Sequence, residues 1–87
     1  MVSQKVKIHN PTGLHLRPAG IFCNTANSFG CKVTFDYEGN TANAKSVLGV
    51  LGACIKKGDE IVIHCDGNGE EEALKAMVEA VESGLGE

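Results

Sequence analysis

Residues 13–27 read GLHLRPAGIFCNTAN, and within this stretch the apolar residues take up the spacing of a helix. Pro18 is tolerated in the first turn of a helix, where its missing N–H would be unpaired anyway. We therefore expect this helix to begin near Leu16 and to end near Asn27. That start places His15 at or beside the N-cap, over backbone N–H groups that form a ready site for an anion.

Patterns on either side of this helix predict four strands and two further helices. The strands are expected at residues 2–9, 31–37, roughly 41–45 and 60–65, with a hairpin turn at 38–40, and the helices at 47–51 and from Glu70 to a terminator at Gly84. Each strand has one apolar face, which favours an antiparallel sheet covered on one side. The expected fold is one α+β domain over residues 1–87, an open-faced sandwich of order β-α-β-β-α-β-α with three helices on one face of a four-stranded antiparallel sheet.

The length and the charge of the chain restrict its function. A domain of 87 residues buries only about 60–65% of its unfolded surface, so we expect any chemistry to lie at the surface. The formal net charge of −3 argues against a nucleic-acid-binding protein. Apolar runs are too short for membrane insertion and the first residues lack the apolar region of a signal peptide, so a cytoplasmic protein is expected.

The four cysteines form no CxxC pair, and without a secretion signal a disulfide framework is not expected. They are Cys23, Cys31, Cys54 and Cys65. Because each lies among apolar residues, we expect reduced thiols buried in the core. Two alternatives stay open: a zinc site with His9 or His64, whose spacing fits no zinc signature, and an exposed redox-sensitive thiol.

His15 and Arg17 together predict an anion site at the start of the helix, with the imidazole of His15 as a nucleophile beside it. The positive end of the helix dipole disfavours a cationic ring, so His15 is expected to be neutral and nucleophilic. A phosphoryl group on the ring would meet outward-pointing N–H groups, and Arg17 adds a permanent cation. The structural alternative is that His15 is a polar capping residue and Arg17 a solvated side chain.

The motif GLHLRPA at residues 13–19 lies near the start of a short chain, as the histidine motif does in HPr. The chain thus resembles HPr, the histidine-containing phosphocarrier of the bacterial phosphoenolpyruvate-dependent sugar phosphotransferase system. The resemblance covers essentially the whole chain. It implies that Enzyme I transfers a phosphoryl group to Nδ1 of His15, and that the group then passes to the A domain of a sugar-specific Enzyme II. It also implies that Arg17 stabilises the transferring charge, and that no cofactor and no metal takes part.

A second motif, NAKSVLG at residues 43–49, resembles the low-GC Gram-positive branch of this family. In that branch the serine at the position of Ser46 is phosphorylated by an ATP-dependent HPr kinase/phosphorylase. On the residues alone, Ser46 is an N-cap of a short helix. A phosphate there adds negative charge at the favourable helix end, so we expect the fold to survive and the effect to fall on partners.

An apolar docking patch is expected beside His15. Its predicted members are Leu16, Gly20, Val47, Leu48 and Leu51. The alternative is that the leucines of the second helix belong to the core, with Leu48 the first candidate. Leu16 is also bulkier than the alanine or threonine common in the family at that place.

Three functions remain open from the sequence. The first is a phosphocarrier, expected to be a monomer, whose partners are Enzyme I, Enzyme II A domains and the kinase. The second is a regulatory module that, phosphorylated on Ser46, binds a transcriptional regulator of carbon catabolite repression. The third is a specialised paralogue serving a nitrogen-related or single-sugar pathway. Because His15 and Arg17 are both present, the first function is favoured.

Overall fold

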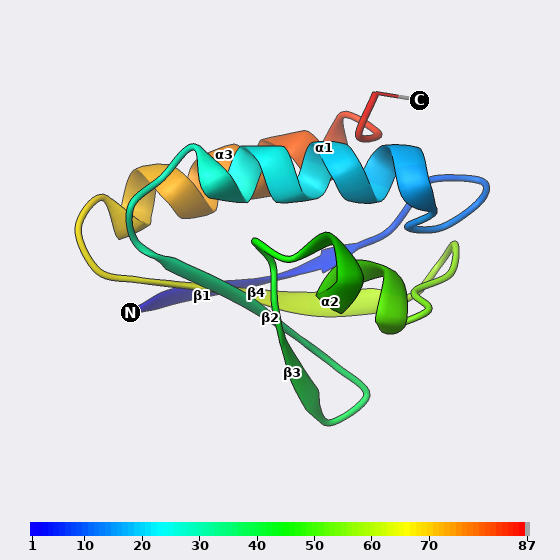
Figure 1. Ribbon diagram of the computed structural model, residues 1–87, viewed down its shortest axis with the longest axis horizontal. Helices are drawn as coiled ribbons and strands as arrows, with labels where there is room; N and C mark the ends of the chain where they lie inside the picture. Colours follow the sequence, from blue (N-terminus) through cyan, green and yellow to red (C-terminus); the bar gives the residue numbers. More distant parts are fainter. Residues whose placement is uncertain (87) are drawn as a thin grey trace.

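The computed structural model describes residues 1–86 and consists of one four-stranded antiparallel sheet with three helices (Figure 1). The elements follow in the order β1 (Val2–Lys7), α1 (Leu16–Asn27), β2 (Lys32–Tyr37), β3 (Asn40–Asn43), α2 (Val47–Gly52), β4 (Glu60–Asp66) and α3 (Glu70–Glu82). This arrangement confirms the predicted open-faced sandwich, and α1 has the predicted bounds.

The strand order β1-β4-β2-β3 places the last strand of the sequence between the first two. The register runs from Val2↔Cys65 to Lys7↔Glu60 between β1 and β4, and from Lys32↔Asp66 to Asp36↔Val62 between β2 and β4. Because side chains alternate across a strand, the apolar residues of β2 and β4 gather on one face of the sheet.

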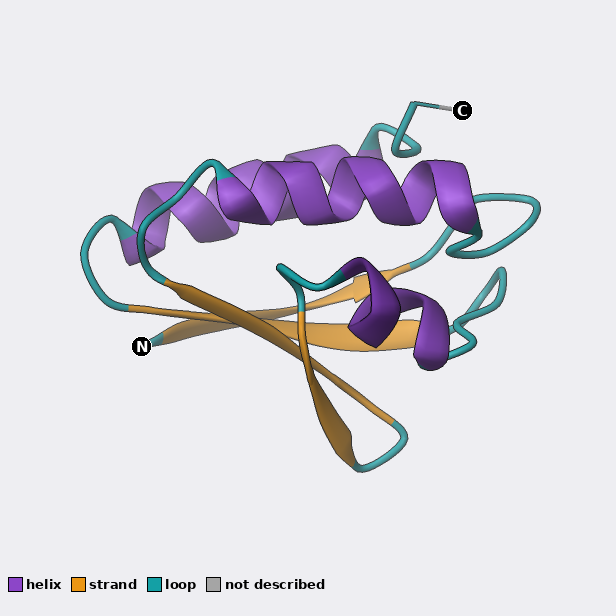
Figure 2. Ribbon diagram, in the orientation of Figure 1, coloured by secondary structure: helices purple, strands orange, loops and turns teal. Residues whose placement is uncertain are grey.

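The helices pack on that apolar face and leave the other face open to solvent (Figure 2). α1 and α3 lie side by side across the sheet, and the short α2 packs against α1 and β3. In the core, Phe22 of α1 meets Phe35 of β2 edge to face, with ring centroids 5.8 Å apart. Such a pair contributes about 0.5–1.5 kcal/mol beyond the burial of its area. No helix within residues 1–86 has both the length and the hydropathy that crossing a membrane requires.

β1 ends at Lys7 and not at residue 9 as predicted. The backbone of Ile8 leaves the sheet and bonds to a turn instead. Its N–H donates to the carbonyl oxygen of Asp59 at 2.9 Å, and its own carbonyl accepts from the N–H of Gly58 at 2.8 Å. The chain is therefore anchored to this turn just before it reaches the segment that holds His15.

β3 also differs slightly from its predicted range of roughly 41–45. It begins at Asn40 because the turn is confined to Glu38 and Gly39, which both have positive φ, as in a two-residue hairpin loop. It ends at Asn43, whose carbonyl accepts from the N–H of Ser46 at 3.2 Å and turns the chain into α2.

Three of the cysteines are buried as predicted, but the prediction is wrong for Cys54, which is exposed. Cys54 follows the C-cap of α2 and has a φ of +56°, in the left-handed region. Its N–H donates to the carbonyl of Leu51 at 3.2 Å. The tight turn that ends α2 thus takes this residue out of the core, which local apolar composition did not indicate.

Candidate functional site

His15 is the N-cap of α1, with extended backbone angles, and its carbonyl accepts the first intrahelical hydrogen bond, from Ala19 at 2.8 Å. Its ring makes no capping hydrogen bond and the residue is exposed. Pro18 has no N–H, so the backbone donors of the first turn without an intrahelical partner are those of Leu16 and Arg17. An exposed imidazole therefore stands at the donor end of a twelve-residue helix.

The segment before His15 is fixed by the loop that connects α2 to β4. The N–H of Leu14 donates to the carbonyl oxygen of Ile55 at 3.1 Å, and the N–H of Gly13 donates to that of Asn10 at 2.9 Å. Gly13 has a φ of +69° and packs directly against the backbone of Ile55. Since Leu14 is buried, its side chain also anchors this segment to the core.

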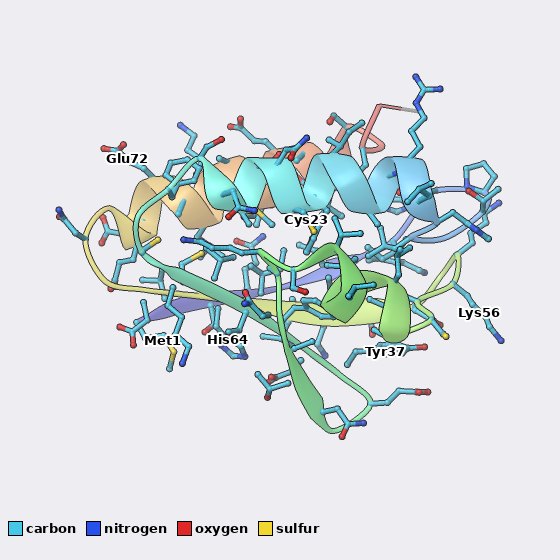
Figure 3. All side chains as sticks on the ribbon, in the orientation of Figure 1. Met1, Cys23, Tyr37, Lys56, His64 and Glu72 are labelled. Atoms are coloured by element: carbon cyan, nitrogen blue, oxygen red, sulfur yellow. The ribbon has the colours of Figure 1, made fainter. Side chains whose placement is uncertain are left out.

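A shallow hollow lies between this segment and the C-terminal end of α2 with the residues that follow it. It is lined by Thr12, Leu14 and His15 on one side and by Leu51, Cys54, Ile55 and Lys56 on the other. Lys56 is exposed at this end of the molecule, beyond the sheet (Figure 3). With Arg17, also exposed, it supplies positive charge to the end of the molecule that carries His15.

Tyr37 and Asp59 brace the loop that forms the far wall of the hollow. The hydroxyl of Tyr37 donates to Oδ2 of Asp59 at 2.5 Å, and the same oxygen accepts from the N–H of Lys56 at 2.8 Å. The hydrogen bond to Asp59 is the main cause that raises the pKa of Tyr37 to about 12, and the Tyr37 hydroxyl is the main cause that lowers the pKa of Asp59. The sequence pattern predicted only a turn at Asp59. It gave no signal for the bond to Tyr37, because the two residues are 22 positions apart.

Ser46 is the N-cap of α2, as predicted, and its Oγ accepts from the N–H of Gly49 at 3.1 Å. The hollow that contains His15 lies at the opposite end of α2, where Leu51 lines it. Leu51 is five positions after Ser46, which corresponds to about 7.5 Å of axial rise along a helix. Ser46 therefore lies at the N-terminal end of α2, whereas the hollow that His15 lines lies at the C-terminal end of that helix.

The predicted docking residues lie on α1 and α2, which pack against each other. Leu16 and Leu48 are strongly exposed, at 70% and 81%, and Val47 is exposed at 37%. Gly20 and Leu51 are half-buried. The alternative that Leu48 belongs to the core is wrong. Val50 is the buried residue of α2, and two positions along a helix turn Leu48 about 200° away from it.

Comparisons with known proteins agree with this geometry. The sequence pattern of the family described as "PTS HPr component phosphorylation site" matches residues 2–83. The HPr-like protein Crh of Bacillus subtilis is 37% identical over 82 residues, covering 94% of this chain and 96% of Crh.

Two solved structures of HPr from Thermoanaerobacter tengcongensis are each 37% identical to the chain. One superposes with a TM-score of 0.96 over 100% of this chain and 98% of the other. The second, described as an HPr dimer, has a TM-score of 0.80 over 100% of both chains. The chain belongs to the HPr family.

Proposed function

We propose that the chain is a phosphocarrier that receives a phosphoryl group on His15 from phosphorylated Enzyme I and donates it to Enzyme II A domains. The observation that carries the proposal is that the ring of His15 is exposed at the N-terminus of α1 and makes no capping hydrogen bond. Nδ1 of the neutral ring attacks the phosphorus, a new N–P bond forms, and the N–P bond in the donor breaks. The group then leaves by the same step in reverse onto the acceptor.

The surroundings of His15 suit a group that must both arrive and leave. Arg17 and the N–H groups of the first turn meet the charge on the phosphoryl oxygens, and each exposed contact contributes about 0.3–1 kcal/mol. Contributions of this size stabilise the phosphorylated ring without trapping it. The shallow hollow leaves the ring accessible, so the partner completes the site.

Regulation at Ser46 is part of the same proposal. An HPr kinase/phosphorylase adds a phosphate to Ser46, beside the exposed side chains of Val47 and Leu48. The dianion then lies at the rim of the docking patch and opposes the burial of apolar surface against Enzyme I. Because Ser46 lies at the far end of α2 from the hollow, the effect acts on docking and not on the His15 ring itself.

A second candidate function is favoured by the similarity to Crh. In it the Ser46-phosphorylated chain binds a transcriptional regulator of carbon catabolite repression, and phosphoryl transport is incidental. His15 and Arg17 favour the carrier role over this one. We expect the chain to be a monomer in solution, whereas one structure of the Thermoanaerobacter tengcongensis protein is described as a dimer. Light scattering measures the oligomeric state directly.

The decisive experiment incubates the chain with Enzyme I and phosphoenolpyruvate and assays bound phosphate. The expected product is acid-labile, base-stable and absent from His15→Ala; a phosphate that persists in His15→Ala contradicts the proposal. With ATP and the kinase, the expected product is acid-stable and absent from Ser46→Ala. Ser46→Asp should accept phosphate from Enzyme I more slowly, whereas Ser83→Asp, an exposed serine at the end of α3, serves as the matched control.

A further inference from the structure

A second cluster of reactive side chains lies on the open face of the sheet, away from the helices. Oγ of Ser3 and Nδ1 of His64 are hydrogen-bonded at 2.5 Å, and Nε2 of His64 is hydrogen-bonded to Oδ2 of Asp36 at 2.8 Å. The hydroxyl of Thr41 donates to the other oxygen of Asp36 at 2.6 Å. Figure 3 shows His64 on the side of the sheet opposite α1 and α3.

Hydrogen bonding defines the role of each group in this cluster. A carboxylate only accepts, so Nε2 of a neutral His64 carries the proton that bonds to Asp36. Nδ1 is then free of a proton and accepts from the hydroxyl of Ser3. The bonds from Thr41 and His64 lower the pKa of Asp36, so its carboxyl stays ionised near neutral pH. A nucleophile, a base and an orienting carboxylate are thus joined in sequence, which is the arrangement that activates serine hydroxyls.

The sheet holds these groups rigidly. Ser3 and His64 are direct partners across β1 and β4, and Thr41 and Asp36 are direct partners across β3 and β2. Asp36 lies diagonal to His64, since Thr34 is the direct partner of His64 on β2. Four strands therefore contribute one side chain each, and sites built on strands are positioned more accurately than sites on loops. Ser3 itself is exposed and accessible to small reagents.

We propose that Ser3 is an acyl-acceptor nucleophile, activated by His64 and oriented through Asp36, that reacts with small activated esters and thioesters. Oγ of Ser3 attacks the carbonyl carbon and its proton passes to Nδ1 of His64. The bond to the leaving alkoxide or thiolate breaks, and the imidazolium returns the proton to that leaving group. The products are O-acyl Ser3 and a free alcohol, phenol or thiol. The reaction is independent of phosphoryl transfer at His15.

The probe for the test is p-nitrophenyl acetate at pH 7.5, with each acetylated residue located by peptide mass spectrometry. We expect acetyl on Ser3 in the wild type and its absence in Ser3→Ala. The rate at Ser3 is expected to fall about a hundredfold in His64→Gln, because general-base catalysis contributes roughly 10²–10⁴-fold. A fall of at least about tenfold is expected in Asp36→Asn, where the ring loses the partner that fixes its tautomer.

Matched controls separate activation from general reactivity. His9→Gln, which removes an exposed histidine outside the cluster, should leave the rate at Ser3 unchanged. Ser28, an exposed serine whose hydroxyl donates to a backbone carbonyl, gives the background rate within each protein. Circular dichroism and thermal unfolding check that each variant is folded. The proposal is overturned if folded His64→Gln acetylates Ser3 as fast as wild type, or if Ser3 reacts no faster than Ser28.

Discussion

The α-carbon of Gly13 lies so close to the backbone of Ile55 that a β-carbon at Gly13 would meet the Ile55 carbonyl oxygen and come within 2.8 Å of the Lys56 α-carbon. The same carbonyl accepts the N–H of Leu14 at 3.1 Å. Gly13 therefore lets the segment before His15 approach the wall of the hollow more closely than any other residue allows. This contact connects the loop after α2 to the position of the imidazole.

Gly13→Ala tests this contact. The substitution adds a clash with backbone atoms to the strain of a positive φ, so we expect a loss of about 2–4 kcal/mol in the free energy of unfolding. Gly39→Ala is the matched control, because Gly39 also has a positive φ but has no heavy atom within 4 Å of the added carbon. Urea unfolding of both variants gives the comparison. Equal losses in the two would mean that the contact with Ile55 carries no cost of its own.

Leu48 and Val50, two residues apart on α2, should respond in opposite ways to truncation. Leu48→Ala removes an exposed side chain, so the free energy of unfolding should change by less than about 0.5 kcal/mol. The KM of Enzyme I for this chain as phosphoryl acceptor should rise. Val50→Ala empties part of the core and should cost about 2 kcal/mol, with KM unchanged while the protein is folded. An unchanged KM in Leu48→Ala would remove Leu48 from the docking patch.

The thiols should divide into one reactive group and three protected ones. Cys54 is exposed, whereas burial raises the pKa of Cys23 and, with a further contribution from Cys31, raises the pKa of Cys65 to about 11. Ellman's reagent should therefore modify one thiol per folded chain quickly and the other three only after unfolding in urea. Cys54→Ser should lose the fast phase and keep the slow one. Two or more fast thiols in the wild type would contradict the burial of the other three.

What the sequence predicted well depends on local signals. The bounds of α1 follow from Pro18 and from the apolar spacing that ends at Ala26, and the N-cap role of Ser46 follows from its place before a short apolar run. His15 and Arg17 belong to one continuous motif, so their common location needed no knowledge of the fold. These features involve residues within a few positions of one another.

What the sequence did not predict depends on strand order and on packing. Ser3 and His64 are 61 positions apart, and they meet because β4 lies between β1 and β2. The sequence left open whether Leu48 belongs to the docking patch or to the core, because six residues are too few for a periodic pattern to decide which side of the helix faces the sheet. The exposure of Cys54 depends on the turn after that helix. None of these features leaves a local sequence signal.

The bond between Tyr37 and Asp59 gives the chain a measurable dependence on alkaline pH. In the folded protein the pKa of Tyr37 is raised from 10 to about 12, first by its hydrogen bond to Asp59, with a smaller contribution from the charge of Glu38. A raised pKa means that the bond stabilises the fold fully below pH 10, and that this stability is lost as pH rises through about 12. Tyr37 is the one tyrosine and there is no tryptophan, so absorbance at 295 nm follows this group alone.

We expect a folded-state midpoint near 12 in the wild type. Asp59→Asn should move the midpoint towards 10, because an amide no longer opposes ionisation of the phenol by its charge. Glu38→Gln, the matched control, should move it much less, because the charge of Glu38 acts without a hydrogen bond to the phenol. If Asp59→Asn and Glu38→Gln shifted the midpoint equally, the bond would not be the main cause. Asp59→Ala, which removes the oxygen that accepts from the N–H of Lys56 in the wall of the hollow, should also slow phosphate acceptance by His15.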